Sequence, residues 1–451
     1  MLASSFVLLI LGGTLGLRLL PGLYTGERLG WIDSLFTATS AVCVTGLTVV
    51  DTATYFTWLG QAWVLLLIQL GGLGIITFTT LIILALGRRL SLEHESITSS
   101  TAGIAPIVDY RHLARAIVVF TFAVEALGTI LLMAFWVPRY GPAGAWHALF
   151  HAISAFCNAG FSTFSRNLMD FQLAPGVLLT IAALIVIGGI GFITMDELYL
   201  WRRLKHDRRM LRRFGGIAPR VSLHTRIVLV TTAALIVGGW VLLLAFEWQV
   251  SLREMPVWAK AVNGLFMSIT PRTAGFNNVD YSQVSDPGNF LTVLLMAIGG
   301  SPGSTAGGLK TTTFALIGLL AWARLRGRTT VDIAGRTVPE ETIQRSVGLF
   351  VICFTIITAG IFLFLLTELA RTASGQAGHQ LLPYMFEATS AFNTVGLSMN
   401  VTMELSPAGR IAGVLLMYLG RVGPLTIAAA IARPRGGGGD FRYAYEDVIV
   451  G

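Results

Sequence analysis

The chain has 451 residues, of which 54% are hydrophobic and only 12% are charged. A soluble protein carries roughly twice that fraction of charged residues, so the composition excludes an ordinary soluble globular fold. The formal net charge of +8 does not indicate nucleic-acid binding, because the basic residues stand in short connections between apolar runs rather than in one basic segment.

Long apolar runs indicate membrane-spanning helices, which need about 20 residues to cross the hydrocarbon core of a bilayer. Eight runs come near or above this length, at residues 2–20, 59–86, 113–136, 175–200, 223–246, 290–325, 344–366 and 407–432. The first run lacks a basic start and a small-residue cleavage site. We therefore expect it to be a membrane helix rather than a signal peptide.

Four shorter, semi-polar stretches alternate with these runs, at residues 33–40, 145–156, 257–269 and 381–391. Each is about three helical turns long and too short to span a membrane. A small polar segment with one glycine follows each stretch, and the four glycines are Gly46, Gly160, Gly275 and Gly396. A leucine or phenylalanine and then a small polar residue follow every one of them. Such agreement at near-equal spacing predicts an internal repeat.

We therefore expect an all-α integral membrane fold. Eight transmembrane helices would form four helix–pore-loop–helix repeats around one central pore. The expected units are repeat 1 (1–87), repeat 2 (88–204), repeat 3 (205–325, with a broken inner helix and a gating loop at 299–313), repeat 4 (326–433) and a C-terminal tail (434–451). Lys and Arg concentrate in the connections on the side of both termini, which predicts that this side is cytoplasmic and that the glycine loops enter from outside.

The glycine loops have the composition of an ion filter. Non-helical backbone at membrane depth must be buried or line water, and rings of backbone carbonyls can replace the water shell of a dehydrated cation. The preceding half-helix points its partly negative C-terminus at the same place. A single glycine could simply end a helix, but four matched segments favour a filter. The carbonyls assigned to it belong to Val44, Thr45, Gly46, Asn158, Ala159, Gly160, Thr273, Ala274, Gly275, Thr394, Val395 and Gly396.

The run 290–325 is the one inner run that we expect to be broken. Glycines and Pro302 in its middle are incompatible with a membrane helix, and such a break persists only where it lines a cavity. We interpret it as a gate below the filter, formed by Gly299, Gly300, Ser301, Gly303, Ser304, Thr305, Gly307, Gly308 and Lys310, with Arg421 from the last run. A phosphate-binding loop is the rival interpretation, but it requires a preceding strand.

Four ionisable residues expected at membrane depth, three in the runs and Glu387 in the fourth short stretch, leave alternatives open. Lys310 at membrane depth is either functional or a snorkelling or ion-paired structural lysine. Arg421 replaces the second glycine of a Gly-Gly pair found in the other three repeats, and it either faces the pore or pairs with a carboxylate. Glu125 and Glu387 are either structural hydrogen-bond partners or contributors to the ion path.

The remaining polar candidates lie on or after the short stretches. Asp33 is placed to cap its half-helix. Asp51 and Asp280 each follow a filter glycine by five residues, and they either concentrate cations at the outer mouth or are solvated loop carboxylates. His147 and His151 stand one turn apart, but a metal site is improbable because no third ligand is near.

These motifs resemble the Trk/Ktr/HKT superfamily of potassium transporters, in which four filter segments carry one glycine each. Eight spans without extra N-terminal helices, and the tail 443–451, are most similar to the KtrB subunit of bacterial Ktr systems. The resemblance implies a multi-pass protein of the bacterial inner membrane and a homodimer with one pore per subunit. It also implies a cytosolic KtrA-type ring that binds ATP or ADP, uptake that is often Na⁺-dependent, and an electrostatic barrier at Arg421.

The function that we expect is potassium uptake through a gated pore, with K⁺ in the filter, no covalent cofactor and no nucleic-acid partner. The sequence leaves Na⁺ passage open, because Val44 and Asn158 break the uniformity of the filter. An inverted-repeat carrier for an organic solute would need two halves of opposite orientation. A membrane enzyme would need a nucleophile–base–orienter group or a cofactor motif, and we find neither.

Overall fold

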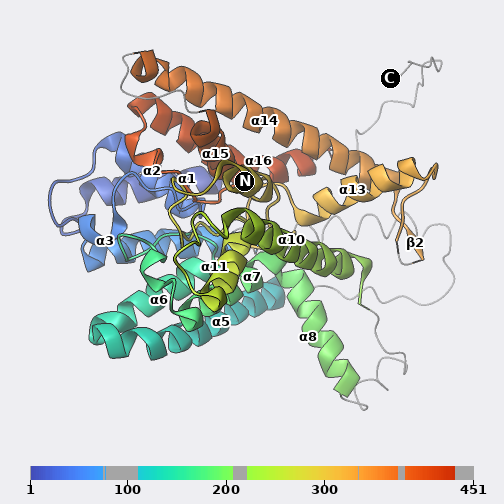
Figure 1. The fold of residues 1–451 in the computed structure, drawn as a ribbon, viewed down its shortest axis with the longest axis horizontal. Coiled ribbons are helices and arrows are strands. Elements are labelled where there is room, and N and C mark those ends of the chain that lie inside the picture. The colour runs from blue at the N-terminus through green and yellow to red at the C-terminus, as the bar shows by residue number, and fades with distance from the viewer. Residues whose placement is uncertain are drawn as a thin grey trace.

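The computed structural model describes residues 2–74, 77, 110–206, 221–333, 335–373 and 381–431, which are mostly helical (Figure 1). The long or medium helices are α1 (Leu2–Leu19), Trp58–Gly74, α5 (Tyr110–Tyr140), α7 (Pro175–Ile190), α8 (Phe192–His206), α10 (Leu223–Glu247), α12 (Asp286–Ala297), α13 (Thr311–Leu325), α14 (Glu340–Ala373) and α16 (Pro407–Ile431). The helices that match the expected half-helices are α2 (Trp31–Val42), α6 (Pro142–Phe156), α11 (Val257–Ile269) and α15 (Leu381–Phe392). The smaller elements are α3 (Thr52–Tyr55), the 3₁₀ turns η1 (Met169–Phe171) and η2 (Thr402–Glu404), and an antiparallel hairpin of β1 (Asp332–Ile333) and β2 (Arg336–Thr337).

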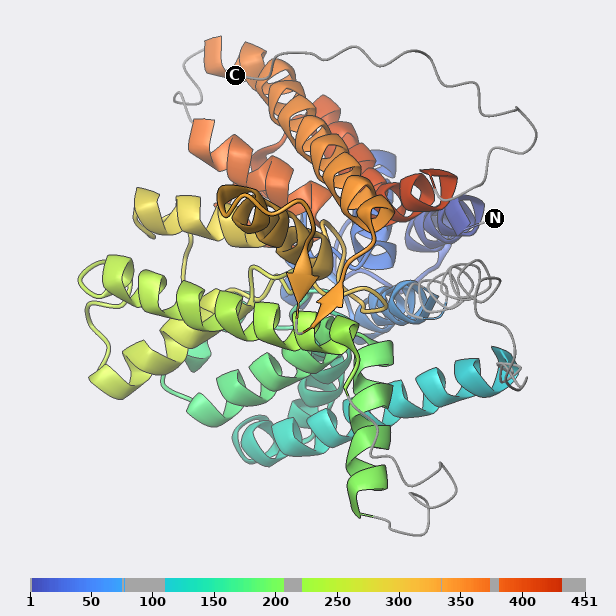
Figure 2. The same ribbon diagram turned by 90° about the vertical axis from the view of Figure 1, so that its right-hand side faces the viewer.

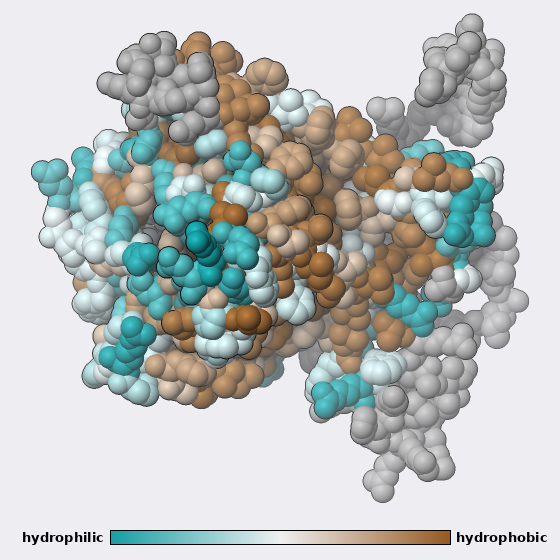
Figure 3. Space-filling model, viewed as in Figure 1, coloured by the Kyte–Doolittle hydropathy of each residue, from teal (hydrophilic) through white to brown (hydrophobic). Residues whose placement is uncertain are grey.

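The molecule has an apolar middle between two polar ends. Figure 3 shows hydrophobic residues gathered between a hydrophilic end near α3 and hydrophilic patches near the hairpin and the start of α8. Among the described residues, α5, α10 and α14 each contain a stretch long and apolar enough to cross a membrane, and α7 with α8 would be a fourth if that bent pair is one span. Shorter apolar helices include α1, Trp58–Gly74 and α13. The eight-span organisation therefore stays a prediction, and the tail 434–451 lies outside the described residues.

The run 290–325 is broken, as expected. Helix α12 ends at Ala297 and α13 begins at Thr311, so residues 298–310, here called the crossing loop, are not helical. The expected gating loop extended to residue 313. The structure instead places 311–313 in the first turn of α13, where Lys310 is the N-cap residue.

A second inner run is also broken, and the expectation of only one break was wrong. The run 175–200 divides into α7 and α8, whose axes differ by 97°. Gly191 lies between them with a φ of +92°, and a Cβ atom added there would lie closer than 3.0 Å to the carbonyl oxygen of Pro302. The crossing loop thus occupies the space that a straight helix would need, and only glycine permits this turn so close to another backbone.

The chain runs once around a common centre. Figure 2 shows the elements following one another around it, until the last helices lie beside the first. Each short helix packs against the long helix before it: α2 on α1, α6 on α5, α11 on α10 and α15 on α14. Contacts of α16 with α1 and α2 close the circle.

Glycines let the inner helices approach the ends of the short helices. A Cβ atom added at Gly71, Gly188 or Gly420 would lie closer than 3.0 Å to a carbonyl oxygen. Those oxygens belong to Val42, Phe156 and Phe392, which are the last residues of α2, α6 and α15. The first glycine of three of the four Gly-Gly or Gly-Arg pairs therefore serves the close packing of an inner helix on a short helix.

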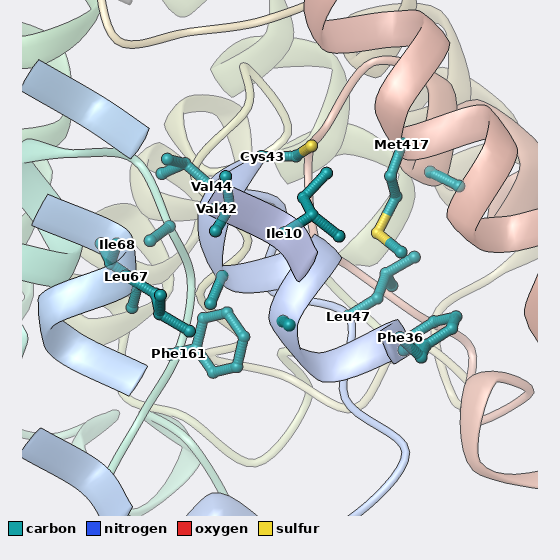
Figure 4. Packing of buried hydrophobic residues seen from close by; sticks show 14 of the residues in the cluster. Ile10, Phe36, Val42, Cys43, Val44, Leu47, Leu67, Ile68, Phe161 and Met417 are labelled. Atoms are coloured by element: carbon teal, nitrogen blue, oxygen red, sulfur yellow. The ribbon is translucent and has the colours of Figure 1, made fainter. Parts of the chain in front are cut away.

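Apolar side chains surround the backbone after α2. Figure 4 shows Leu67 from the helix Trp58–Gly74 beside Phe161, while Met417 of α16 reaches toward Leu47 and Phe36. All five side chains are at most 3% exposed. The loop that carries the first glycine segment is therefore held by residues from three distant parts of the sequence.

Candidate ion pathway

The four short helices end in loops that share an unusual backbone conformation. The residue two positions before each glycine has a φ between 50° and 70°, and these residues are Val44, Asn158, Thr273 and Thr394. The glycines themselves have a φ between 70° and 96°. Positive φ is rare for a β-branched residue, yet three of the four are β-branched. Such conformations persist only where the surrounding structure imposes them, and they cluster at functional sites.

The four loops meet in a closed ring. A Cβ atom added at any of the four glycines would lie closer than 3.0 Å to the carbonyl oxygen that precedes the glycine of another segment. The pairs are Gly46 with Ala159, Gly160 with Ala274, Gly275 with Val395, and Gly396 with Thr45. Each segment thus touches the next in chain order, and the fourth touches the first. All twelve residues assigned to the filter belong to these four loops.

Hydroxyl groups at the ends of the short helices hold the ring in place. In two segments a serine accepts a hydrogen bond from the glycine N–H at 3.1 Å: Ser40 from Gly46 and Ser390 from Gly396. In the other two a hydroxyl donates at 2.8 Å to the carbonyl after the glycine: Ser154 to Phe161 and Thr270 to Phe276. These contacts were not predicted from the sequence. The sequence does contain a pattern that could have indicated them, because three of the four hydroxyl residues stand six positions before their glycine.

The histidine pair supports the second segment. His151 is fully buried, and its Nδ1 donates to the carbonyl oxygen of His147 at 2.8 Å. Its Nε2 is then the acceptor for the Ser162 hydroxyl, 2.9 Å away. His147 lies 2.6 Å from the hydroxyl of Thr163. Through these contacts with Ser162 and Thr163 the pair positions the backbone that follows Gly160.

The crossing loop lies against two opposite members of the ring. The Thr305 hydroxyl donates at 3.2 Å to the carbonyl of Phe156, which ends α6 at the second segment. Gly307 and Gly308 approach Thr394 and Asn393 of the fourth segment so closely that no Cβ atom would fit. Because the second and fourth segments are not neighbours in the ring, a loop that touches both passes across it.

Two cationic side chains bind neighbouring carbonyls of the crossing loop. Lys310 Nζ donates to Ala306 and Arg421 Nη1 donates to Thr305, both at 2.5 Å. Arg421 is 2% exposed, and its Nε and Nη2 have no hydrogen-bond partner among the described residues. No described carboxylate pairs with either side chain. The salt-bridge alternative for Arg421 thus has no support.

Another cationic side chain is buried next to the third filter segment. Arg272, in the loop after α11, is 7% exposed, and its Nε has no hydrogen-bond partner among the described residues. Together with Gly189 and Gly300 it lines a cavity of about 10 Å³. This residue had no role among the sequence-based predictions, because its burial depends on the packing of α7 and the crossing loop.

The two intramembrane glutamates are hydrogen-bonded next to the ring. Glu125 accepts from Gln69 at 3.1 Å and lies 3.8 Å from the thiol of Cys157, the last residue before the second segment. Glu387 accepts from the Ser398 hydroxyl at 2.9 Å, just after the fourth segment. These contacts favour the interpretation of both glutamates as structural partners of the filter loops.

Each of the three aspartates has a partner among the described residues. Asp33 does not cap α2, because Gly30 is the N-cap residue and no side chain bonds there. Asp33 instead forms an ion pair with Arg410 of α16. Asp51 caps the short α3 by accepting from the N–H of Ala53 at 2.9 Å. Asp280 accepts from the Ser282 hydroxyl at 2.7 Å.

A small cavity opens on the ring next to these loops. It has a volume of about 150 Å³, and its lining includes Gly46, Gly396, Asn277 and Arg166. Asp51 and Asp280 do not line it, nor does any other described carboxylate. Asp280 nevertheless lies beside the cavity, because it accepts a hydrogen bond at 3.3 Å from Asn400, which is one of the lining residues.

Three buried or half-buried glutamates were missed entirely. Each accepts hydrogen bonds from the N–H and hydroxyl of the serine that begins a later helix. The pairs are Glu197 with Ser222 before α10, Glu247 with Ser285 before α12, and Glu368 with Ser406 before α16. These carboxylates thus hold the first residues of α10, α12 and α16.

Comparison with known proteins agrees with this architecture. The sequence matches the family model TrkH, described as cation transport protein, over residues 2–436. The potassium/sodium uptake protein NtpJ of Enterococcus hirae is 34% identical over 100% of this chain and 96% of its own length. The Ktr system potassium uptake protein B is 37% identical in Bacillus subtilis, covering 100% of this chain and 96% of that protein, and 38% identical in Vibrio alginolyticus, covering 89% and 84%.

A solved structure shares the fold. The crystal structure of the potassium transporter TrkH from Vibrio parahaemolyticus superposes with a TM-score of 0.70 at 18% identity, over 95% of this chain and 83% of that one. The chain therefore belongs to the TrkH family of cation transport proteins, and it is a multi-pass membrane transporter rather than an enzyme.

Proposed function

We propose that this protein takes up K⁺ across the bacterial cell membrane through the ring formed by its four glycine loops. The relatives named above as potassium uptake proteins support this cation. The observation that carries the proposal is the closed ring, in which each glycine meets the carbonyl of another segment. Four loops with left-handed backbone in the same two places can turn successive carbonyl oxygens toward one axis, where they replace water around a K⁺ ion.

The wider organisation of the pathway follows from the same proposal. The long helices cross the membrane eight times in four helix–pore-loop–helix repeats, with both termini in the cytoplasm. Helices α2, α6, α11 and α15 point their C-terminal ends at the ring, and the partial negative charge there stabilises a cation. The pore thus needs no carboxylate in the filter itself.

The crossing loop is the gate in this proposal. It touches the second and fourth segments and so lies across the ion path. Lys310 and Arg421 hold two of its carbonyls, and their positive charges oppose the passage of a cation in a medium of low dielectric. Movement of the loop away from the ring would remove both the steric and the electrostatic barrier.

Partners are part of the proposal as well. Relatives named as components of a Ktr system support assembly with a cytosolic KtrA-type ring, which would bind ATP or ADP and move the gate. A homodimer of this chain would offer one pore per subunit. One relative is named as a potassium/sodium uptake protein. Whether Na⁺ activates uptake or passes through the pore as a second ion is therefore a question for measurement.

Uptake of ⁸⁶Rb⁺ into proteoliposomes tests the proposed function. Purified full-length protein should support Rb⁺ uptake that K⁺ suppresses strongly, with Na⁺ and Cs⁺ competing less. Empty liposomes and liposomes with an unrelated membrane protein provide the background. Uptake no faster than this background, or equal competition by all three ions, would contradict a K⁺-selective filter. Saturating uptake of an organic solute would instead favour a carrier.

A further inference from the structure

Helix α8 leaves the bundle at nearly a right angle. Its axis differs by 97° from that of α7, and Figures 1 and 2 show it projecting beyond the other helices. Helix α7 is almost wholly apolar, as a membrane-crossing helix must be. If α7 runs across the bilayer, α8 must run along its surface.

The composition of α8 suits a membrane surface and not the hydrocarbon core. Its sequence includes Asp196, Glu197 and Arg202 and ends in a basic stretch at 202–206. Tyr199 is 55% exposed, and Leu200 and Arg202 are exposed beside it. Aromatic side chains settle at the headgroup level of a bilayer, and neighbouring Arg and Lys residues attract anionic lipids.

The other end of α8 is fixed inside the protein. Phe192 and Thr194 in its first turn are buried. Glu197 accepts hydrogen bonds from Ser222 at 2.7 Å and Thr225 at 2.5 Å at the start of α10. Only the last turns therefore project, and a force on them acts on a helix that is held near its base.

The bend between α7 and α8 is hydrogen-bonded to the crossing loop. Three backbone bonds join them: Ser301 N–H to Gly189 at 2.9 Å, Thr305 N–H to Gly188 at 3.3 Å, and Phe192 N–H to the carbonyl of Gly303 at 3.0 Å. Gly191 approaches Pro302 so closely that a side chain would not fit. Of these three bonds, the one from Phe192 begins in α8 itself, so a movement at the base of α8 would act on the crossing loop at Gly303.

We propose that the projecting end of α8 binds the anionic headgroup layer of the membrane, and that this contact sets the position of the crossing loop. The ligand is a phospholipid with a net negative headgroup, contacted by Tyr199, Leu200 and Arg202. The lipid contact is independent of the transport activity, while its effect on the loop rests on the proposed function.

Spin labels at the end of α8 test the contact directly. The three native cysteines are buried, so a Tyr199→Cys variant of the full-length protein is labelled at one site. We expect its label to be more accessible to O₂ than to Ni-EDDA in vesicles of phosphatidylcholine with phosphatidylglycerol. An Arg336→Cys label on the exposed strand β2 should report water. Equal Ni-EDDA accessibility at both sites would overturn the proposal and leave α8 available to a cytosolic protein.

Rubidium uptake tests the link to the loop. Wild-type uptake should differ by roughly fivefold between vesicles with and without phosphatidylglycerol, as expected from the attraction of about one basic residue. Arg202→Gln should reduce this difference, whereas Arg336→Gln, which removes the same charge from the hairpin, should not. Uptake that is insensitive to lipid while the Tyr199→Cys label lies in the membrane would overturn the link. No uptake in any vesicle would contradict the proposed function instead, with the label result unaffected.

Discussion

Single residues decide whether the ring can close. The four glycines of the filter loops combine positive φ with an approach to a neighbouring carbonyl that leaves no room for a Cβ atom. Either condition alone would disfavour a side chain, since left-handed backbone costs a non-glycine residue about 1–2 kcal/mol. Together they make the glycines contact points between segments, in addition to giving each loop its conformation.

Replacement of Gly275 by serine should therefore weaken selectivity for K⁺ over Na⁺. The added side chain meets the carbonyl of Val395 and forces the third and fourth segments apart, so a smaller, better hydrated ion can pass. Rubidium uptake with Na⁺ as competitor measures the effect. The matched control is Gly238→Ser in α10, where no atom lies within 4 Å of an added Cβ. Unchanged competition in Gly275→Ser would contradict the filter assignment.

The internal repeat allowed these glycines to be predicted from the sequence. Contacts between residues that are not part of a repeat were missed. The four glycine segments recur along the chain, so their positions are evident from the order of the amino acids alone. The ion pair of Asp33 with Arg410 joins residues 377 positions apart, and no local pattern indicates it. Asp33 was expected to cap α2, because its place near the start of that helix is compatible with both roles.

At the scale of elements, the sequence indicated one broken helix and missed the other. The first break contains Pro302 and several glycines, which are incompatible with a helix whatever surrounds them. The second depends on one residue, Gly191, in an apolar run that would otherwise continue. Its cause is tertiary, because the crossing loop replaces the helical hydrogen bonds that the bend loses. The charged residues after 195 were the only local signal that the run ends there.

The crossing loop should respond to loss of the cations that hold it. Lys310→Gln and Arg421→Gln each remove a charge-assisted hydrogen bond to a loop carbonyl, and such bonds contribute about 1.5–3 kcal/mol. We expect either variant to raise Rb⁺ uptake measured without a cytosolic partner, by roughly tenfold or more. Arg328→Gln on the exposed connection before β1 is the control of equal charge change. A lower or unchanged rate in both variants would argue against a closed gate held by these residues.

Helix α12 should depend on its cap for stability. The Ser285 hydroxyl accepts from the N–H of Gly288 at 3.2 Å and donates to the buried Glu247. Loss of an N-cap costs about 1 kcal/mol, and a carboxylate left without a donor adds to this. Ser285→Ala should therefore lower the free energy of unfolding in SDS by roughly 1–3 kcal/mol, while Ser282→Ala, on an exposed turn, should have little effect. Equal stability of the two variants would show that the cap is dispensable.

The whole molecule is a ring, so its last repeat must pack against its first. Each segment contacts the next in sequence, so three of the four contacts join parts of the chain that are synthesised consecutively. The fourth, between Gly396 and Thr45, brings together the two ends of the pathway. Sequence repetition predicted the four glycine segments, including the two that meet here, but no repeated pattern indicates the packing of α16 on α2 that accompanies this closure.

The ion pair of Asp33 with Arg410 is the clearest contact at this closure, and a double-mutant cycle should detect it. Both side chains are less than a third exposed, at 26% and 21%, so we expect a coupling energy of about 1 kcal/mol. Asp33→Asn and Arg410→Gln should each lower the free energy of unfolding in SDS, and the double variant should lose less than their sum. The charge-exchanged pair, Asp33→Arg with Arg410→Asp, should recover part of the loss. The control is the same cycle at Arg166 and Asp170, an exposed pair within one loop, where the coupling should be smaller. Additive effects at Asp33 and Arg410 would mean that apolar packing of α16 on α2 closes the ring without this contact.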